Sequence, residues 1–201
     1  MVIFHVEDST EASEPNMLQR RSSGILLHPT SLPGPYGIGD LGTAAYQFVD
    51  YLVAAGQSNW QVLPLGPTGY GDSPYASFSS FAGNPMLISV DRLVEDGDLE
   101  WSEVVPPTDI SDHRVYFGPV IGWKTDLLYR AAERFLKDAS QSRRAAFSHF
   151  CQLHASWLED FAMFMALKNH FDRQAQQHAA PNSMWNVYWD REVKLREPIA
   201  I

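Results

Sequence analysis

The chain has 201 residues, of which 45% are hydrophobic and 12% aromatic, enough for one globular domain with a hydrophobic core. Its net charge of −9 argues against nucleic acid or an anionic membrane surface as a partner, because both attract clustered Lys and Arg. The single cysteine, Cys151, excludes an internal disulfide and suits a reducing compartment. No stretch approaches the ~18 apolar residues of a membrane span. We therefore expect a soluble, cytoplasmic protein.

Residues 1–19 are polar and acidic, with no Lys or Arg before Arg20, so they lack the pattern of a secretory signal. Their low hydrophobicity predicts a disordered arm. Met17 lies just before the ordered part and is a candidate second start.

Two short apolar runs, residues 24–28 and 60–65, predict strands that are covered on both faces. Between them, apolar residues recur at helical spacing from Leu41 to Ala55. Asp40 is placed as the N-cap and Gly56 as the C′ residue. Strand, helix and strand form a βαβ unit, in which ligands bind at the carboxyl ends of the strands.

The loop at residues 66–85 follows the second strand and is rich in Gly, Pro and Ser, yet it carries four aromatic side chains. These aromatics either pack beneath the loop as a small core cluster or form a ligand platform. The position after a strand end favours function. Tyr75 is the best candidate for stacking on a sugar, because a tyrosine offers an apolar face and a hydrogen-bonding edge.

Beyond the loop, residues 86–90 predict a last extended piece, and residues 91–122 are acidic and irregular. Apolar stripes then predict a helix around residues 127–136 and a longer helix over residues 147–171, paired as a helical hairpin. Trp185 and Trp189 follow a polar stretch.

No pattern of metal ligands or nucleotide-binding glycines stands out, so we expect neither a metal nor a cofactor. The seven histidines are scattered, and Cys151 lies on an apolar helix face, as expected for an inert thiol. Asp40, Asp72 and Asp91 adjoin strand ends, where a catalytic carboxylate could sit. A helix cap is the preferred interpretation of Asp40, and a turn that of Asp72.

Several motifs together closely resemble the N-terminal region of 4-α-glucanotransferases, the amylomaltase or disproportionating-enzyme family. They are residues 23–33 (SGILLHPTSLP), 37–42 (GIGDLG), 60–66 (WQVLPLG), 71–75 (GDSPY), 81–85 (FAGNP) and 164–168 (FMALK), with Trp185 and Trp189. The resemblance runs from about Arg21 to the last residue.

The resemblance implies an α/β fold, the N-terminal part of a (β/α)8 TIM barrel with a mainly helical inserted subdomain. It also implies transfer of a segment of an α-1,4-glucan to a sugar 4-hydroxyl by retaining double displacement. Carried over by motif, Tyr75 resembles the tyrosine that stacks on the sugar at the cleavage site. Ser73 resembles an acceptor-side contact, with Asp72 beside it, and Tyr70 a residue of an outlying glucan site.

The family's catalytic motifs, an R-x-D-H-F segment with the nucleophilic Asp and later an acid/base Glu and an H-D pair, do not occur in this sequence. A closed barrel needs about 250 residues. We therefore expect an incomplete barrel: an arm at 1–19, the first βα units at 20–90 and a helical insertion at 91–201. Its strands would have open edges.

Two functional interpretations remain open. The chain belongs to a 4-α-glucanotransferase that becomes active only with a missing C-terminal part, or it is a non-catalytic fragment or glucan-binding module. An unorthodox hydrolase pair of Asp40 and Asp72 is a third, less favoured alternative.

Overall fold

The computed structural model describes residues 2–5, 21–111, 113–177 and 189–197. The chain forms two compact units, residues 1–143 and residues 144–201, each treated by itself below. Among the described residues, no helix is both long and apolar enough to cross a bilayer.

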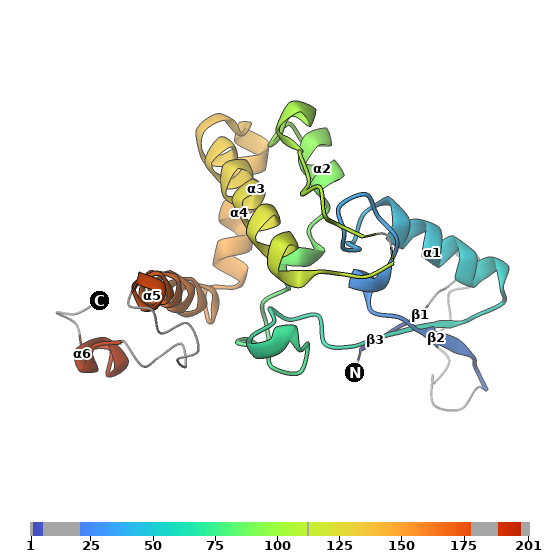
Figure 1. The fold of residues 1–201 in the computed structure, drawn as a ribbon, viewed down its shortest axis with the longest axis horizontal. Coiled ribbons are helices and arrows are strands. Elements are labelled where there is room, and N and C mark those ends of the chain that lie inside the picture. The colour runs from blue at the N-terminus through green and yellow to red at the C-terminus, as the bar shows by residue number, and fades with distance from the viewer. Residues whose placement is uncertain (1, 6–20, 112, 178–188, 198–201) are drawn as a thin grey trace. The chain divides into compact units, whose positions relative to one another are not determined.

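The first unit contains a three-stranded sheet in the order β1-β3-β2 (Figure 1). Strands β2 (Gly24–Leu26) and β3 (Asn59–Val62) run parallel, as the βαβ pattern predicts, although both end earlier than the apolar runs suggest. Strand β1 (Val2–His5) pairs antiparallel with β3. These four residues are therefore part of the sheet instead of the disordered arm expected from composition, whereas residues 6–20 lie outside the described part.

Helix α1 (Thr43–Ala54) connects the two parallel strands and begins later than expected. Asp40 is not its N-cap, because the helix starts after Gly42, whose amide donates to Asp40 Oδ1 at 2.8 Å. Gly56 ends the helix as predicted, with φ +65° and its amide bonded to the Val53 carbonyl. The helix packs on the sheet around a core of buried residues: Leu32, Ala45, Leu52, Trp60 and Val62.

The segment after the loop is helical, so the expectation of an extended piece at residues 86–90 is wrong. Asn84 explains the difference, because its side chain accepts the Met86 amide at 2.9 Å and Pro85 occupies the first turn of the 3-10 helix η3 (Pro85–Leu87). Helix α2 (Val90–Glu95) and the 3-10 helix η4 (Trp101–Glu103) follow in a region expected to be irregular.

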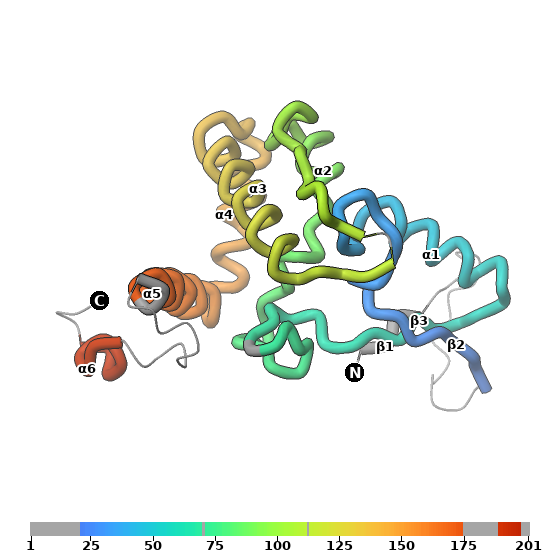
Figure 2. Tube along the Cα trace, viewed as in Figure 1, coloured from blue at the N-terminus to red at the C-terminus, as the bar shows by residue number. Residues whose placement is uncertain are grey.

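Helix α3 (Phe117–Asp138) has 22 residues, more than twice the length of the apolar stripe at residues 127–136, and it packs against the first strand–helix loop. Two core clusters join these parts: one contains Tyr36, Val90, Leu99, Leu127 and Ala131, the other Ile38, Met86 and Val120. Figure 2 shows the chain that leads into α3 running beside the blue loop that follows β2. The expected boundary near residue 90 thus lies inside the first unit.

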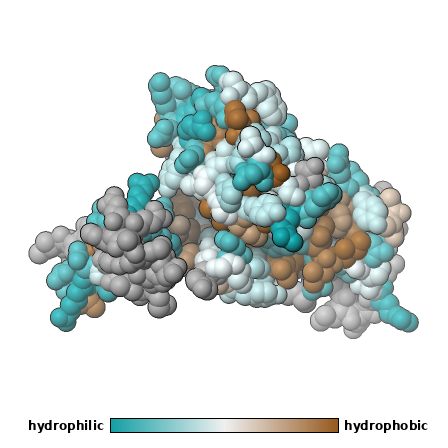
Figure 3. All heavy atoms as spheres, viewed as in Figure 1, coloured by the Kyte–Doolittle hydropathy of each residue, from teal (hydrophilic) through white to brown (hydrophobic). Residues whose placement is uncertain are grey.

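Apolar atoms also reach the surface of the first unit beside α1 and the strands, as the brown patches in Figure 3 show. Exposed apolar residues of these elements include Leu26 and Val53. The first unit therefore presents hydrophobic surface as well as its buried core.

The second unit holds most of α4 (Gln141–Leu153), with α5 (Leu158–Gln177) and α6 (Arg191–Lys194). The long helix expected over residues 147–171 is interrupted by a turn at His154, whose amide donates to the Phe150 carbonyl and whose Nδ1 accepts from Trp157 Nε1. Trp189 contacts the rings of Phe164 and Phe171 on α5. Trp185 lies outside the described residues.

Candidate functional site

Two loops lie at the carboxyl ends of the parallel strands β2 and β3, the edge where α/β folds bind ligands. The first, residues 27–42, joins β2 to α1. The second, residues 66–85, follows β3 and carries the side chains that the sequence marks as candidate ligand contacts. Within the first loop, the Gly39 amide donates to the Thr30 carbonyl at 2.9 Å.

The second loop is closed on itself at both ends. Its base is fastened by the Asn84 amide, which donates to the Leu65 carbonyl at 2.7 Å, and its arms meet in an isolated bridge between Thr68 and Ser77. The arms approach so closely that a Cβ on Gly69 would lie 2.5 Å from the Ala76 carbonyl oxygen. A loop held this way can present side chains in fixed positions without a helix or strand of its own.

The aromatic side chains of this loop are not one buried cluster. Tyr75 is 74% exposed and Phe81 is 73% exposed, and neither belongs to a core cluster of the first unit. Phe78 is half-buried. Tyr75 and Phe81 therefore expose ring surface to solvent, so the alternative of a buried cluster does not hold for these two residues.

The other predicted contacts lie just before Tyr75. The 3-10 turn η2 (Tyr70–Asp72) contains Tyr70 and Asp72, and Ser73 follows at its end. The Tyr75 amide donates to Ser73 Oγ at 3.3 Å, which leaves the Ser73 hydroxyl hydrogen available to a ligand. Asp72 has φ +55°, in the left-handed region that Asp tolerates better than most residues. The backbone of Tyr70 is described but its side chain is not. Ser73, Asp72 and Tyr75 thus lie together in the chain at one tip of the loop.

A buried lysine on α3, whose role was not predicted from the sequence, connects this helix to the first loop and to η3, which follows the second loop. Lys124 is fully buried, and its Nζ donates to the Met86 carbonyl at 2.8 Å and lies 3.7 Å from Asp40 Oδ2. Burial lowers the pKa of Lys124 and raises that of Asp40, and their mutual attraction opposes both shifts. The sequence does contain a signal for this burial. Lys124 lies on the same face of α3 as the buried apolar residues Val120, Leu127 and Ala131.

Asp91 is also engaged inside the first unit, because the Tyr36 hydroxyl donates a short hydrogen bond to its carboxylate. Burial is the main cause that raises the pKa of Tyr36, and the bond to Asp91 adds to it. Asp40 and Asp91 therefore act as fixed structural groups that hold the first loop against α2 and α3. This arrangement does not favour the hydrolase pair of Asp40 and Asp72.

His28 lies near the start of the first loop, two residues after the end of β2. Its Nδ1 lies 2.7 Å from Thr30 Oγ1 and accepts the Thr30 amide at 3.4 Å, which places the ring proton on Nε2 in the neutral form. Nε2 is buried and has no hydrogen-bond partner at bonding distance among the described residues. Burial lowers the pKa of His28, while the Pro64 carbonyl acts in the opposite direction. Burial therefore favours the neutral form of the His28 imidazole.

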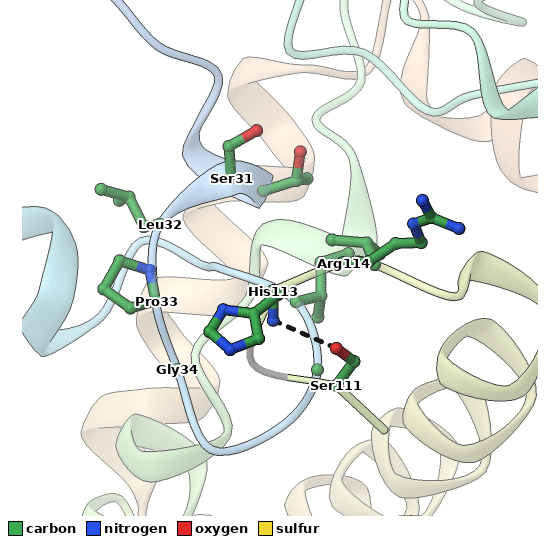
Figure 4. Close-up of a pocket in the computed structure, with 11 residues that line it drawn as sticks. Ser31, Leu32, Pro33, Gly34, Ser111, His113 and Arg114 are labelled. Carbon is green, nitrogen blue, oxygen red and sulfur yellow. Dashed lines mark hydrogen bonds between the residues drawn. The ribbon is translucent and has the colours of Figure 1, made fainter. Parts of the chain in front are cut away.

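A cavity of about 240 Å³ opens between the first loop and the segment before α3 (Figure 4). The His113 ring is turned towards Pro33 and Gly34, whereas the Arg114 guanidinium points away, and the His113 amide donates to Ser111 Oγ at 3.1 Å. No group of three or more metal-binding side chains occurs in the described part of the chain.

The comparisons with known proteins give the family. The family model of 4-alpha-glucanotransferases matches residues 27–200. The 4-alpha-glucanotransferase of Synechocystis sp. is 44% identical over 92% of this chain and 35% of its own length, and that of Thermus thermophilus is 52% identical over 74% of this chain and 29% of its own. The structure of an amylomaltase from Streptococcus agalactiae in complex with acarbose matches with a TM-score of 0.77 and 38% identity, over 90% of this chain and 34% of its own.

This chain belongs to the 4-alpha-glucanotransferase family. It spans about a third of the length of the relatives that it matches. The match begins at the residue after β2 and includes both loops of the candidate site.

Proposed function

We propose that this chain supplies part of the substrate site of a 4-α-glucanotransferase. This enzyme moves a segment of an α-1,4-glucan to the 4-hydroxyl of an acceptor glucose or glucan, in the cytoplasm. We also propose that β2, α1 and β3 are the first units of a (β/α)8 barrel, with a mainly helical insertion after them. The family relationship and the parallel β2–β3 pair on either side of α1 support this assignment.

The observation that carries the proposal is Tyr75, which a closed loop after β3 holds 74% exposed. A tyrosine ring in this position can stack on the C–H face of a pyranose ring, and its hydroxyl can bond a sugar hydroxyl. Ser73 and Asp72 supply short polar groups beside it, and Tyr70 belongs to the same turn.

Retaining transfer needs two carboxyl groups about 5–5.5 Å apart, one as nucleophile and one as acid/base. The family motifs that carry such groups do not occur in this sequence, and Asp40 and Asp91 are committed to Lys124 and Tyr36. We therefore assign this chain a binding contribution and expect the covalent steps to require residues that it does not contain.

Titration with maltoheptaose, followed by tryptophan fluorescence or calorimetry, tests the binding contribution. We expect saturable binding, and Tyr75→Ala should weaken it about fivefold, since an aromatic contact is worth about 1 kcal/mol. Tyr51→Ala is the matched control, because Tyr51 is also an exposed tyrosine but lies on α1. Equal affinity of the wild type and Tyr75→Ala would contradict the assignment.

Incubation with maltotriose tests the catalytic part of the proposal. The isolated chain should produce neither glucose nor longer maltodextrins. If both products form and Tyr75→Ala loses them, the reacting carboxylates belong to this chain. The proposal that the covalent steps require residues outside this chain would then be wrong.

The second candidate is a glucan-binding module with no catalytic partner. The exposed Phe81, 73% accessible on the same loop as Tyr75, favours it because two aromatic surfaces can serve binding alone. Joining this chain to the remaining two-thirds of the Thermus thermophilus relative distinguishes the two: a glucanotransferase part restores transfer in a folded hybrid, whereas a binding module does not.

A further inference from the structure

The antiparallel strand β1 lies on the edge of β3 where the next parallel strand of a barrel would pair. In the order β1-β3-β2, the central strand β3 has β2 on one edge and β1 on the other. The register pairs Val2 with Val62 and His5 with Asn59, so the partners of β1 extend over all four residues of β3. In the part of the chain that the structure describes, both edges of β3 are therefore filled.

A parallel barrel adds its strands in chain order, each beside the one before it. Because β2 already lies on one edge of β3, the strand that follows β3 in a barrel must take the opposite edge. This is the edge that β1 holds. One edge accepts one strand, so β1 and a following parallel strand exclude each other.

The sequence of β1 suits a strand that covers an edge. Val, Ile and Phe, the types at positions 2–4, favour strands, and the segment has no proline that would interrupt pairing. The register places Phe4 opposite Trp60 and Val2 opposite Val62, the two buried positions of β3. An open strand edge invites pairing with other chains, and a covering strand prevents this.

We infer that residues 2–5 act as an exchangeable cap on the β3 edge, which they protect until a parallel barrel strand takes their place. The inference rests on the barrel fold proposed above. A four-residue strand on a small sheet is weakly held, and its covalent tether returns it when no competitor is present. These two properties are what a reversible cap requires.

Amide hydrogen exchange at residues 59–62 tests whether β1 protects the edge. In a variant that lacks residues 1–16 and begins at Met17, we expect the amides of this stretch that face β1 to exchange about tenfold faster or more, because the outer ladder is lost, whereas the amides that face β2 should change little. A peptide of residues 1–10 added in trans should slow the exchange again. Unchanged exchange after deletion would overturn the inference.

Point variants keep the test independent of a large deletion. Successive N–H groups of a strand point to opposite sides, so one of the two neighbours Ile3 and Phe4 directs its N–H towards β3. Proline at that position removes the bond, and of Ile3→Pro and Phe4→Pro the variant that does so should speed amide exchange in β3 as much as the deletion does. Ser13→Pro, outside β1, is the control and should exchange like the wild type. If neither proline in β1 speeds exchange at β3, the pairing does not protect this edge.

Displacement by a barrel strand is tested in a hybrid in which this chain replaces the matched third of the Thermus thermophilus relative. If the barrel strand takes the edge, residues 59–62 should be protected to the same degree with or without residues 1–16. If the deletion makes these amides exchange faster in the hybrid, β1 still occupies the edge, and the proposed replacement of β1 by a barrel strand is wrong. This readout does not depend on glucan transfer, so it separates failure of the cap from failure of the proposed function.

Discussion

Burial of Lys124 on the apolar stripe of α3 leaves its ammonium group dependent on two partners, the Met86 carbonyl and the Asp40 carboxylate. Lys124→Met removes the charge at similar volume and leaves Asp40, with its side chain only 12% exposed, without its cation. Removal of one member of a buried pair typically costs about 3–5 kcal/mol in the free energy of unfolding. We expect a loss of about 3 kcal/mol in urea denaturation.

Lys137→Met is the matched control, since this lysine lies exposed on the same helix and its replacement should change stability by about 0.5 kcal/mol or less. The double variant Lys124→Met/Asp40→Asn should lose less than the two single variants added together, because each single change leaves the other group unpaired. Additive losses would show that the 3.7 Å pair contributes no coupling.

His28 gives the first unit a pH dependence. Its pKa in the folded state lies below the ordinary 6.5, so between those two values the unfolded chain binds more protons than the folded chain. Stability from this group is complete above pH 6.5 and decreases as the pH falls towards the folded-state pKa. His28→Gln should therefore lose this decrease, measured as the difference between wild-type and variant unfolding free energies across the window.

His113→Gln is the control for His28, because it makes the same substitution at an exposed histidine and so shows the effect of the exchange without loss of a buried ring. If the profiles of wild type and His28→Gln run parallel below pH 6.5, the burial of His28 does not govern acid stability.

At the scale of the element, the conformation of the first loop requires a glycine at position 39, near the end of the loop. A Cβ on Gly39 would lie 2.1 Å from the Pro29 carbonyl oxygen and 2.7 Å from that of Leu32, and neither backbone atom can move without opening η1 (Pro29–Ser31). Gly39→Ala should destabilise the first unit by about 1–3 kcal/mol or more, measured by denaturant unfolding. Gly83→Ala, where a Cβ meets nothing within 4 Å, should be nearly neutral. If Gly39→Ala and Gly83→Ala change the free energy of unfolding equally, the first loop can rearrange to accommodate the Cβ at position 39.

The sequence predicted the elements whose signals are local. The βαβ unit, the end of α1 at Gly56 and the loop after β3 follow from apolar runs and turn residues, and the structure has each of them. The start of α1 was misplaced because Asp40, a good N-cap type, bonds the Gly42 amide and Lys124 instead. Tertiary pairing thus overrode a local preference.

Two of the features that the sequence missed depend on contacts between distant segments, and a third has a local signal. Pairing of β1 with β3 and the Lys124–Asp40 pair join residues more than 50 positions apart, which no periodicity reveals. The turn at residues 85–87 was missed because its signal, Asn84 before Pro85, was interpreted as part of a loop. For the candidate site, sequence and resemblance supplied Tyr75, Ser73, Asp72 and Tyr70. Their roles in binding remain predictions, and the structure adds the exposure of Tyr75.

At the scale of the whole molecule, the two units differ in how much core they possess. The three core clusters all lie within residues 1–143, whereas the buried apolar residues described in the second unit are Phe171 and Val193. Much of the second unit's contact is aromatic and half-exposed, as between Trp157 and Phe161. Because buried apolar surface supplies most of the free energy of folding, the second unit should be the less stable one.

We therefore predict that α5 opens more readily than α3, although the two helices have similar lengths of 20 and 22 residues. In native-state hydrogen exchange with increasing denaturant, amides of α5 should exchange through an opening of lower free energy than those of α3. Limited proteolysis should cut within residues 144–201 first and leave a resistant fragment that contains α3. A single cooperative transition with equal opening free energies in both helices would contradict this, because the core of the first unit would then stabilise the second to the same extent.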